Sequence, residues 1–582
     1  MYICCIMNRI KRYFPILGWL KTYSSSFLKG DITAGITVGI MLIPQGMAYA
    51  MIAGLPPVYG LYAALFPQIV YAIMGTSRQL AVGPVAMDSL LVAAGLGALS
   101  ISSPTEYIVL ASFLALFMGV IQLVLGGLKL GFLVNFLSKP VISGFTSAAA
   151  IIIALSQLNH LLGIDIPRSN KLHTLFIFLV EMGPQAHLLS VLISTLGVSF
   201  LWITKKYFPK LPGALLLVFL TTFIAAQFNW ESLGVNIVKE VPEGLPTFIL
   251  PKASLSQVYA LFPLALTLAL IAFMEAISVA KAIEEKEKTN HLNPNQELIA
   301  LGSANIIGGL FQAYPSTGGF SRTAVNHDAG AKTGISALFS AAIVGLTLLF
   351  FTSFFYHLPT AVLGAIILVA VGKLIDLSYP KKLWKNNRSE FYILLFTFSI
   401  TLFVGIKEGI LLGVFAALLY MVYQNTRPHI AVLGRIKNTH YFKNIDRFSK
   451  DVTTFPNVLI LRFDGQLFFG NQRYFKQQIS HLIKNQTEPV KHLVLAAAPI
   501  NYIDASAIEM LSLLSDELKE NTTNLYWTGL SGPIRDKFYS VGLLGDYTHV
   551  FAYSSLEAAL NAIEGKAPSE IEKSIATQRN NH

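Results

Sequence analysis

The chain is dominated by long apolar runs, most of them about 17 to 25 residues, the length that a helix needs to cross a bilayer. Two shorter apolar segments, beginning at Pro84 and Ser321, bring the prediction to about fourteen membrane-spanning helices. No comparable run follows Gln424. The longer runs lie at 32–52, 57–74, 107–126, 140–158, 186–204, 211–228, 257–280, 296–312, 334–355, 359–373, 391–405 and 407–424.

Composition supports a membrane protein. Of the 582 residues, 53% are hydrophobic and only 13% are charged, whereas soluble domains carry roughly 25% charged residues. The mean hydropathy of +0.57 points the same way. From Thr426 onward the chain has the composition of a soluble protein, so a domain boundary is expected near that residue.

The distribution of charge predicts an orientation. The formal net charge is +11, but the basic residues lie in short loops between apolar runs, which argues against nucleic-acid binding. Basic clusters at 205–210 and 373–388 fall on the same side as both termini, and the loop at 229–256 is acidic. By the positive-inside rule both termini are cytoplasmic. We expect a multi-pass protein of the plasma or inner membrane, in contact with the lipid bilayer.

The two short segments are the strongest functional signal. Residues 75–88 and 313–326 each contain an extended, glycine-containing stretch that leads into a short helix. They lie about 240 residues apart, at corresponding positions in the two halves of the apolar region. Such paired interrupted segments mark transporter binding sites. Two half-helices that start near the bilayer midplane offer free N–H groups and positive potential to an anion.

Several side chains near these segments are candidates for the site. Ser321 is expected to cap the second half-helix or to bind the ligand through its hydroxyl, and Arg322 adds a positive charge. The alternative for Arg322 is a structural clamp with an acidic neighbour. Gln45 and Tyr49 lie four residues apart on one helical face, either lining the same cavity or packing against another helix.

Two carboxylates are candidates for coupling. Glu275 interrupts an apolar run, where an ionisable group is expensive and a functional role is the default. Its protonation would supply the positive charge that uptake of a divalent anion needs against a negative-inside potential. The alternative is a structural ion pair with Arg322 or a lysine. Asp88, near the first half-helix, is the second candidate for carrying a proton.

The pattern of the C-terminal region predicts a small α/β domain. Buried strands are expected at 458–463, 492–496 and 524–529, and helices at 471–484, 505–518 and 533–541. Asp504 and Ser506 lie where a strand passes into a helix. That position suits a phosphoryl group or an anion, or a simple helix cap.

Motifs for other functions are missing from the sequence. Gly330-Ala-Lys-Thr lacks the glycine spacing of a phosphate-binding loop, and there is neither HExxH nor paired CxxC. Cys4 and Cys5 are adjacent and cannot link distant segments. We therefore expect no enzyme activity, no cofactor and no metal.

Several motifs, in order, resemble the SulP family of sulfate permeases and anion exchangers. The resemblance extends over nearly the whole chain, including a C-terminal STAS domain. The motifs are Ile43-Pro-Gln-Gly-Met-Ala-Tyr-Ala, Gly54-Leu-Pro-Pro-Val-Tyr-Gly-Leu-Tyr, Gly75-Thr-Ser-Arg-Gln-Leu-Ala-Val-Gly-Pro, Thr317-Gly-Gly-Phe-Ser-Arg-Thr-Ala-Val-Asn and Gly330-Ala-Lys-Thr.

The resemblance implies a fold and a domain plan. The expected fold is a helical polytopic membrane protein with a seven-plus-seven inverted repeat, core and gate domains, a small cytoplasmic α/β STAS domain and a homodimeric assembly. The expected divisions are a cytoplasmic N-terminal segment at 1–30, an anion-transport domain at 31–425, a linker at 426–454, the STAS domain at 455–565 and a tail at 566–582.

It also implies which residues act. The substrate site falls on Gln45, Tyr49, Val85, Phe320, Ser321 and Arg322. Some relatives have an aromatic residue in place of Val85. Glu275 matches the acidic position of proton-coupled sulfate relatives. Ser506 matches the phosphorylatable serine of anti-sigma-factor antagonists, although Ala507 replaces the usual glycine.

The expected function is proton-coupled sulfate uptake by an elevator-like movement. The alternatives are a bicarbonate or C4-dicarboxylate transporter, a chloride exchanger, or a membrane-bound anion sensor or scaffold that signals through its STAS domain. A cytoplasmic partner at the STAS domain is part of the expectation.

Overall fold

The computed structural model describes residues 13–99, 101, 103–132, 138–164, 177, 180–208, 212–287, 292–372, 375–448, 451–545 and 547–566. The cysteine pair and nearly all of the tail at 566–582 lie outside them. The chain forms two compact units, residues 1–417 and 418–582, which are described separately below.

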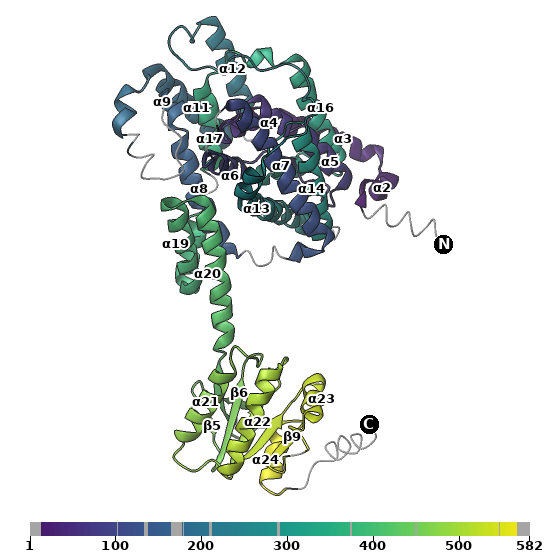
Figure 1. The fold of residues 1–582 in the computed structure, drawn as a ribbon, viewed down its shortest axis with the longest axis vertical. Helices are drawn as coiled ribbons and strands as arrows, with labels where there is room; N and C mark the ends of the chain where they lie inside the picture. The colour runs from purple at the N-terminus through teal and green to yellow at the C-terminus, as the bar shows by residue number, and fades with distance from the viewer. Residues whose placement is uncertain are drawn as a thin grey trace. The chain divides into compact units, whose positions relative to one another are not determined.

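The first unit is helical, and each predicted span corresponds to one helix except the span at 57–74, which forms two (Figure 1). Its first half contains α2 (Ile16–Trp19), α3 (Ser25–Ile52), α4 (Val58–Ala63), α5 (Phe66–Met74), α6 (Ala86–Gly97), α7 (Pro104–Gly127), α8 (Lys139–Ser156), α9 (Leu158–Leu162), α11 (Leu188–Tyr207) and α12 (Gly213–Gln227). The second half contains α13 (Leu255–Glu287), α14 (Pro294–Leu310), α15 (Phe320–Asp328), α16 (Ile335–Phe350), α17 (Thr360–Val371), α18 (Ser378–Asn386), α19 (Arg388–Phe403) and α20 (Ile406–Thr426), which runs on into the second unit. Short 3₁₀ turns lie at Leu20–Thr22, Gly183–Gln185 and Ser353–Phe355.

Among the described residues, five helices are long and apolar enough to cross a membrane by themselves: Ser25–Ile52, Pro104–Gly127, Lys139–Leu162, Leu255–Glu284 and Glu408–Thr426. Shorter apolar helices accompany them, at Val58–Met74, Ala86–Gly97, Leu188–Thr204, Gly213–Gln227, Ile335–Phe350 and Thr360–Val371. The protein is a multi-pass membrane protein.

The span expected at 57–74 is broken between α4 and α5. Pro67 has no N–H to donate to the carbonyl of Ala63, so an uninterrupted helix would lose that bond. Two side chains supply the missing donors: the Ser316 hydroxyl donates to Ala63 O at 3.2 Å, and the Gln68 amide donates to Ala64 O. The break is therefore stabilised by polar partners rather than left unsatisfied.

The two halves of the first unit interlock. Helix α3 packs on α16, and α7 packs on α14, which Figure 1 shows side by side. The α7–α14 contact is close because Gly119 and Gly302 face each other. A Cβ at Gly119 would lie 2.6 Å from Gly302 O, and a Cβ at Gly302 would lie 2.7 Å from Gly119 O.

This contact gives a test of packing. Gly119→Ala is expected to separate α7 from α14 and to destabilise the transport domain by about 1–3 kcal/mol, the usual cost of overpacking. Gly127→Ala, on the same helix, is the control, because a Cβ there meets nothing within 4 Å. Thermal unfolding of the purified protein measures both. Equal unfolding temperatures for the two variants would contradict the proposed role of the glycine pair.

The second unit is built on a seven-stranded sheet in the order β4-β3-β6-β7-β8-β9, with β5 paired to β3. Strands β6 to β9 are parallel, and β3 is antiparallel to β6. The strands are β3 (Ile430–Ile436), β4 (Phe442–Asn444), β5 (Val452–Thr453), β6 (Val458–Phe463), β7 (His492–Ala496), β8 (Asn524–Thr528) and β9 (Val550–Tyr553). The helices are α21 (Gln472–Lys484), α22 (Ala505–Glu520), α23 (Gly532–Ser540) and α24 (Leu556–Ile563).

Alternating strand residues bury both faces of this sheet. Leu461, Leu495 and Trp527 pack in one apolar cluster with residues of α21, α22 and α23, whereas Ile460 and Val494 pack with residues of α24. The three strands and three helices expected from the sequence are confirmed within one or two residues. Strand β3, in contrast, lies in the segment assigned to a linker. Its interior Gly434 and flanking Arg427-Pro428 resemble a loop, but pairing with β6 places it in the sheet.

Candidate anion-binding site

The two interrupted segments meet. Strand β1 (Val82–Gly83) pairs antiparallel with β2 (Thr317–Gly318), with Val82 opposite Gly318 and Gly83 opposite Thr317. Helix α6 begins three residues after β1, and α15 begins two residues after β2. Because the strands are antiparallel, the two short helices start at this strand pair and run in opposite directions. Their free N-terminal N–H groups therefore lie near one another.

The β1–β2 strand pair and the starts of α6 and α15 are called the crossing below. Hydrogen bonds from side chains and backbone hold this crossing in place. The Thr323 hydroxyl accepts a hydrogen bond from Ala81 N at 3.0 Å, and Gly319 N donates to Ala81 O at 3.0 Å. The Thr317 hydroxyl donates to the carbonyl of Ala272 in α13 at 2.6 Å. The extended backbone at this depth is thus satisfied by protein groups, as a membrane interior requires.

Arg322 lies at the centre of the crossing. Its side chain is 3% exposed, and its Nη1 donates to Pro84 O at 2.6 Å, one residue before Val85. The guanidinium also lies against Gly319, where a Cβ would come within 2.7 Å of Nη2. Glycine at 319 therefore makes room for the charged group.

The remaining donors of Arg322 have no partner. Nε and Nη2 are buried and make no hydrogen bond, and no carboxylate lies within ion-pair distance of Arg322 in the described part of the chain. The clamp with an acidic neighbour, the alternative left open by the sequence, is therefore not formed. Burying a cation without an anion is costly, so Arg322 is unlike a structural arginine whose donors are all satisfied.

One buried and one half-buried carboxyl group lie in the same neighbourhood. Asp88, in the first turn of α6, is fully buried, and neither of its oxygens has a hydrogen-bond partner. Glu275 of α13 is half-buried with an unpartnered Oε2, and it interacts electrostatically with both Asp88 and Arg322. No ion pair to Glu275 is found among the described residues, so the structural pair suggested as its alternative is not formed.

The other predicted residues take varied positions. Tyr49 is buried and lies within electrostatic reach of Arg322 and Glu275, and Gln45 is half-buried one turn earlier on α3. Val85 is the half-buried N-cap of α6. Phe320 is 65% exposed and Ser321 is exposed at the start of α15.

Ser321 is not the helix cap. Gly319 occupies the N-cap position, without a capping side chain, and Ser321 is the second residue of α15. The extended segment ends with β2 at Gly318, so the N-cap at Gly319 lies two residues before the serine that was expected to cap the helix. The hydroxyl of Ser321 is left exposed rather than committed to the backbone.

Two further carboxylates, not singled out from the sequence, position the crossing. Glu297 in the first turn of α14 is fully buried and accepts hydrogen bonds from the Tyr71 hydroxyl at 2.7 Å, from Thr76 N at 2.6 Å and from Ser77 N at 3.2 Å. Asp31 near the start of α3 accepts from Lys332 N at 2.7 Å and Thr333 N at 3.0 Å. Glu297 therefore holds the loop that leads into β1, and Asp31 holds the loop that follows α15. The sequence feature that could have identified both residues is a lone carboxylate at the beginning of an apolar span.

The Glu297 network gives a second test of stability. Glu297→Ala would leave the buried Tyr71 hydroxyl and Thr76 N–H without an acceptor, each at a cost of about 1–3 kcal/mol. A clear fall in the thermal unfolding temperature is expected, whereas Glu297→Gln, which keeps one acceptor oxygen, should lose less. If alanine and glutamine variants unfold at the wild-type temperature, Glu297 does not hold this loop.

The predicted STAS residues lie in the second unit. Asp504 caps α22, because its Oδ1 accepts from Ala507 N at 2.9 Å, and its Oδ2 accepts from Phe469 N at 2.8 Å. Ser506 is half-buried and lines a groove of about 620 Å³ between α21 and α22, together with Arg473 and Lys476. Among the described residues, no group of histidine, cysteine and carboxylate side chains could hold a metal.

Comparison with known proteins agrees with this architecture. The sequence pattern of the Sulfate permease family matches residues 28–397, and that of the STAS domain matches residues 449–558. "Sulfate transporter 4.1, chloroplastic" from Arabidopsis thaliana is 38% identical over 558 residues, which cover 93% of this chain and 80% of the relative. Sulfate transporter 1.3 from the same plant is 32% identical, covering 97% and 89%.

Two solved structures share the fold. The murine Solute Carrier 26 family member A9 anion transporter, in its inward-facing state, has a TM-score of 0.89 at 24% identity, covering 96% of this chain and 95% of that one. The transmembrane domain of BicA, a cyanobacterial bicarbonate transporter, has a TM-score of 0.59 at 24% identity, covering 68% and 98%. Both the membrane fold and the α/β C-terminal domain expected from the sequence are confirmed.

Proposed function

We propose, because this chain belongs to the sulfate permease family, that it is a secondary transporter that takes up sulfate together with protons. The anion would bind between the N-termini of α6 and α15. An elevator-like movement of the core domain, which contains both half-helices, would then carry it across the membrane.

The observation that carries the proposal is the unsatisfied guanidinium of Arg322. A buried cation with two unpartnered donors, flanked by the N-terminal N–H groups of two helices, supports an anion-binding role for this position. Arginine presents its donors in a planar fork that suits the oxygens of an oxyanion. The exposed hydroxyl of Ser321 provides a further donor at the same helix start.

Proton coupling is supported by Glu275 and Asp88. Both oxygens of Asp88 and Oε2 of Glu275 are buried and have no hydrogen-bond partner among the described residues, and an unpaired carboxylate in such a place is most simply neutralised by a proton. Protonation would compensate part of the charge of a divalent anion. Gln45, Tyr49, Val85 and Phe320 complete the proposed site as its walls.

Sulfate is proposed over other anions because the sulfate transporters from plants are similar along most of this chain. Bicarbonate, a C4-dicarboxylate and chloride remain the competing substrates, since helix N-termini select charge and size more than identity. Uptake of labelled sulfate into proteoliposomes, with bicarbonate, succinate and chloride as competitors, tests the choice. Unlabelled sulfate should compete best. Stronger inhibition by any of the other three would reassign the substrate, and the absence of all anion uptake would favour a sensor.

The remaining proposals concern assembly and location. We propose that the protein is a homodimer in a cell membrane. We also propose that both termini are cytoplasmic, as the basic loops indicate, and that regulation acts through Ser506 or through a partner at the STAS domain. Crosslinking in membranes tests the dimer, and protease accessibility of the C-terminal domain in sealed vesicles tests the orientation.

A further inference from the structure

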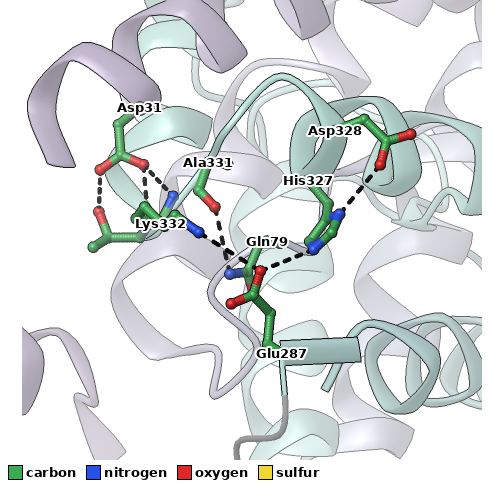
Figure 2. Close-up of polar contacts among 8 residues, drawn as sticks. Asp31, Gln79, Glu287, His327, Asp328, Ala331 and Lys332 are labelled. Atoms are coloured by element: carbon green, nitrogen blue, oxygen red, sulfur yellow. Dashed lines mark hydrogen bonds and ion pairs between the residues drawn. The ribbon is translucent and has the colours of Figure 1, made fainter. Parts of the chain in front are cut away.

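A second polar cluster lies where α13 ends at Glu287 and α15 ends at Asp328 (Figure 2). The ring of His327 lies between two carboxylates. Its Nε2 is 2.9 Å from Glu287 Oε1, and its Nδ1 is 3.2 Å from Asp328 Oδ1. Lys332 Nζ is 3.6 Å from the same Glu287 oxygen.

The protonation state of His327 decides how well this arrangement is satisfied. A neutral imidazole has one N–H, so one of its two nitrogens would turn a lone pair toward a carboxylate oxygen. The protonated ring has two N–H groups and donates to both carboxylates. The contacts on both sides are therefore complete only when the ring is protonated. Histidine ordinarily changes charge between about pH 5 and 8.

The charged groups around His327 come from every element packed near it. Helix α13 contributes Glu287 and Glu284, and α15 itself contributes Asp328. The following loop contributes Lys332, and the loop before β1 contributes Arg78; both line a cavity of about 210 Å³ with the two glutamates. Asp31 of α3 accepts hydrogen bonds from backbone N–H groups of the loop that carries Lys332.

The position of the cluster links it to the transport site. Helix α13 carries Glu275, and α15 carries Ser321 and Arg322. The loop after α15 is held firmly against α3, where a Cβ on Gly30 would lie 2.4 Å from Gly330 O. The His327–Glu287 contact thus links the end of α13 to the end of α15. Helix α13 carries the proposed proton site, and α15 carries the proposed anion site.

We propose that His327 is a second proton-binding position, and that its protonation locks the end of α13 to the end of α15. It acts as a positioning residue: the lock keeps Glu275 and Arg322 in register, and it opens when the pH rises on the side of the membrane that this cluster faces. The consequence for transport rests on the proposed function, but the lock itself does not.

Hydrogen–deuterium exchange tests the lock without any substrate, so it gives a result even if the protein does not carry sulfate. The variant is His327→Gln, compared with wild type at about pH 6 and pH 8, within the range where histidine titrates. At the lower pH, peptides from 280–287 and 323–334 should exchange about two- to fivefold faster in the variant, the ratio expected for a partly exposed ion pair. At the higher pH the two proteins should exchange alike.

Further variants separate protonation from simple hydrogen bonding. His327→Arg carries a permanent charge and should protect these peptides at both pH values. Glu287→Gln should also speed exchange at the lower pH, and it should keep part of that effect at the higher pH because it removes the Lys332 ion pair as well. His357→Gln removes a histidine that has no ion pair in the described part of the chain, and it should match wild type throughout. A difference between His327→Gln and wild type that is equal at both pH values, or missing at both, would overturn the proposal.

Discussion

Replacing Arg322 with alanine is expected to weaken sulfate binding by more than about tenfold, which corresponds to a loss above about 1.4 kcal/mol. The reason is that the variant removes the fixed positive charge of the proposed site, along with two buried donors that have no hydrogen-bond partner in the described part of the chain. Equilibrium binding of labelled sulfate to purified protein measures the effect. Arg473→Ala, an exposed position on α21, is the control and should bind as wild type does.

Lysine at 322 should restore only part of the affinity, since it replaces a planar fork of donors by a single charged point. The sulfate affinity of the lysine variant also tests the role of Arg322 if the alanine variant folds poorly. Wild-type affinity in a well-folded Arg322→Ala protein would remove this residue from the site and leave the helix N-termini as the remaining determinants.

Replacing Glu275 with glutamine is expected to abolish accumulation of sulfate driven by a pH gradient while leaving anion binding and exchange in place. Glutamine resembles the protonated carboxyl in shape and charge, so the site would behave as if permanently loaded with a proton. Under the proposed coupling, the negative charge of bound sulfate would favour protonation of Glu275, and protonation would favour sulfate binding to the same extent, as linkage requires.

The controls for Glu275 distinguish coupling from structure. Glu240→Gln changes an exposed carboxylate in the loop before α13 and should accumulate sulfate normally. Asp88→Asn tests the second buried carboxyl near the anion site. Accumulation by Glu275→Gln with the wild-type dependence on the pH gradient would make Glu275 structural and would shift the coupling role to Asp88.

Much of the site was predictable because it is encoded in local interruptions of an apolar pattern. Gly83-Pro84 and Gly318-Gly319 break the helical runs, and the pairing of β1 with β2 follows from their equivalent places in the two halves. The burial of Arg322 follows from its position just inside the second half-helix. These features depend on short stretches of sequence and on the known cost of placing charge and irregular backbone in a membrane.

What could not be predicted depends on partners distant in sequence. Glu297 and the loop at 76–77 are separated by more than 200 residues, and the sequence has no local sign of their hydrogen bonds. The capping of α15 by Gly319 instead of Ser321 reflects how far β2 extends when it is paired with β1. Strand β3 has a loop-like composition and is stabilised by pairing with β6.

The most direct test of proton-coupled sulfate transport is the accumulation of labelled sulfate in proteoliposomes under an imposed pH gradient, with the membrane potential clamped. An inward proton gradient should drive sulfate above its external concentration in the wild type, and dissipating the gradient with a protonophore should release it. The Arg322→Ala and Glu275→Gln proteins should show no such accumulation. Uptake that only equilibrates, and that ignores the direction of the gradient, would contradict coupling to protons.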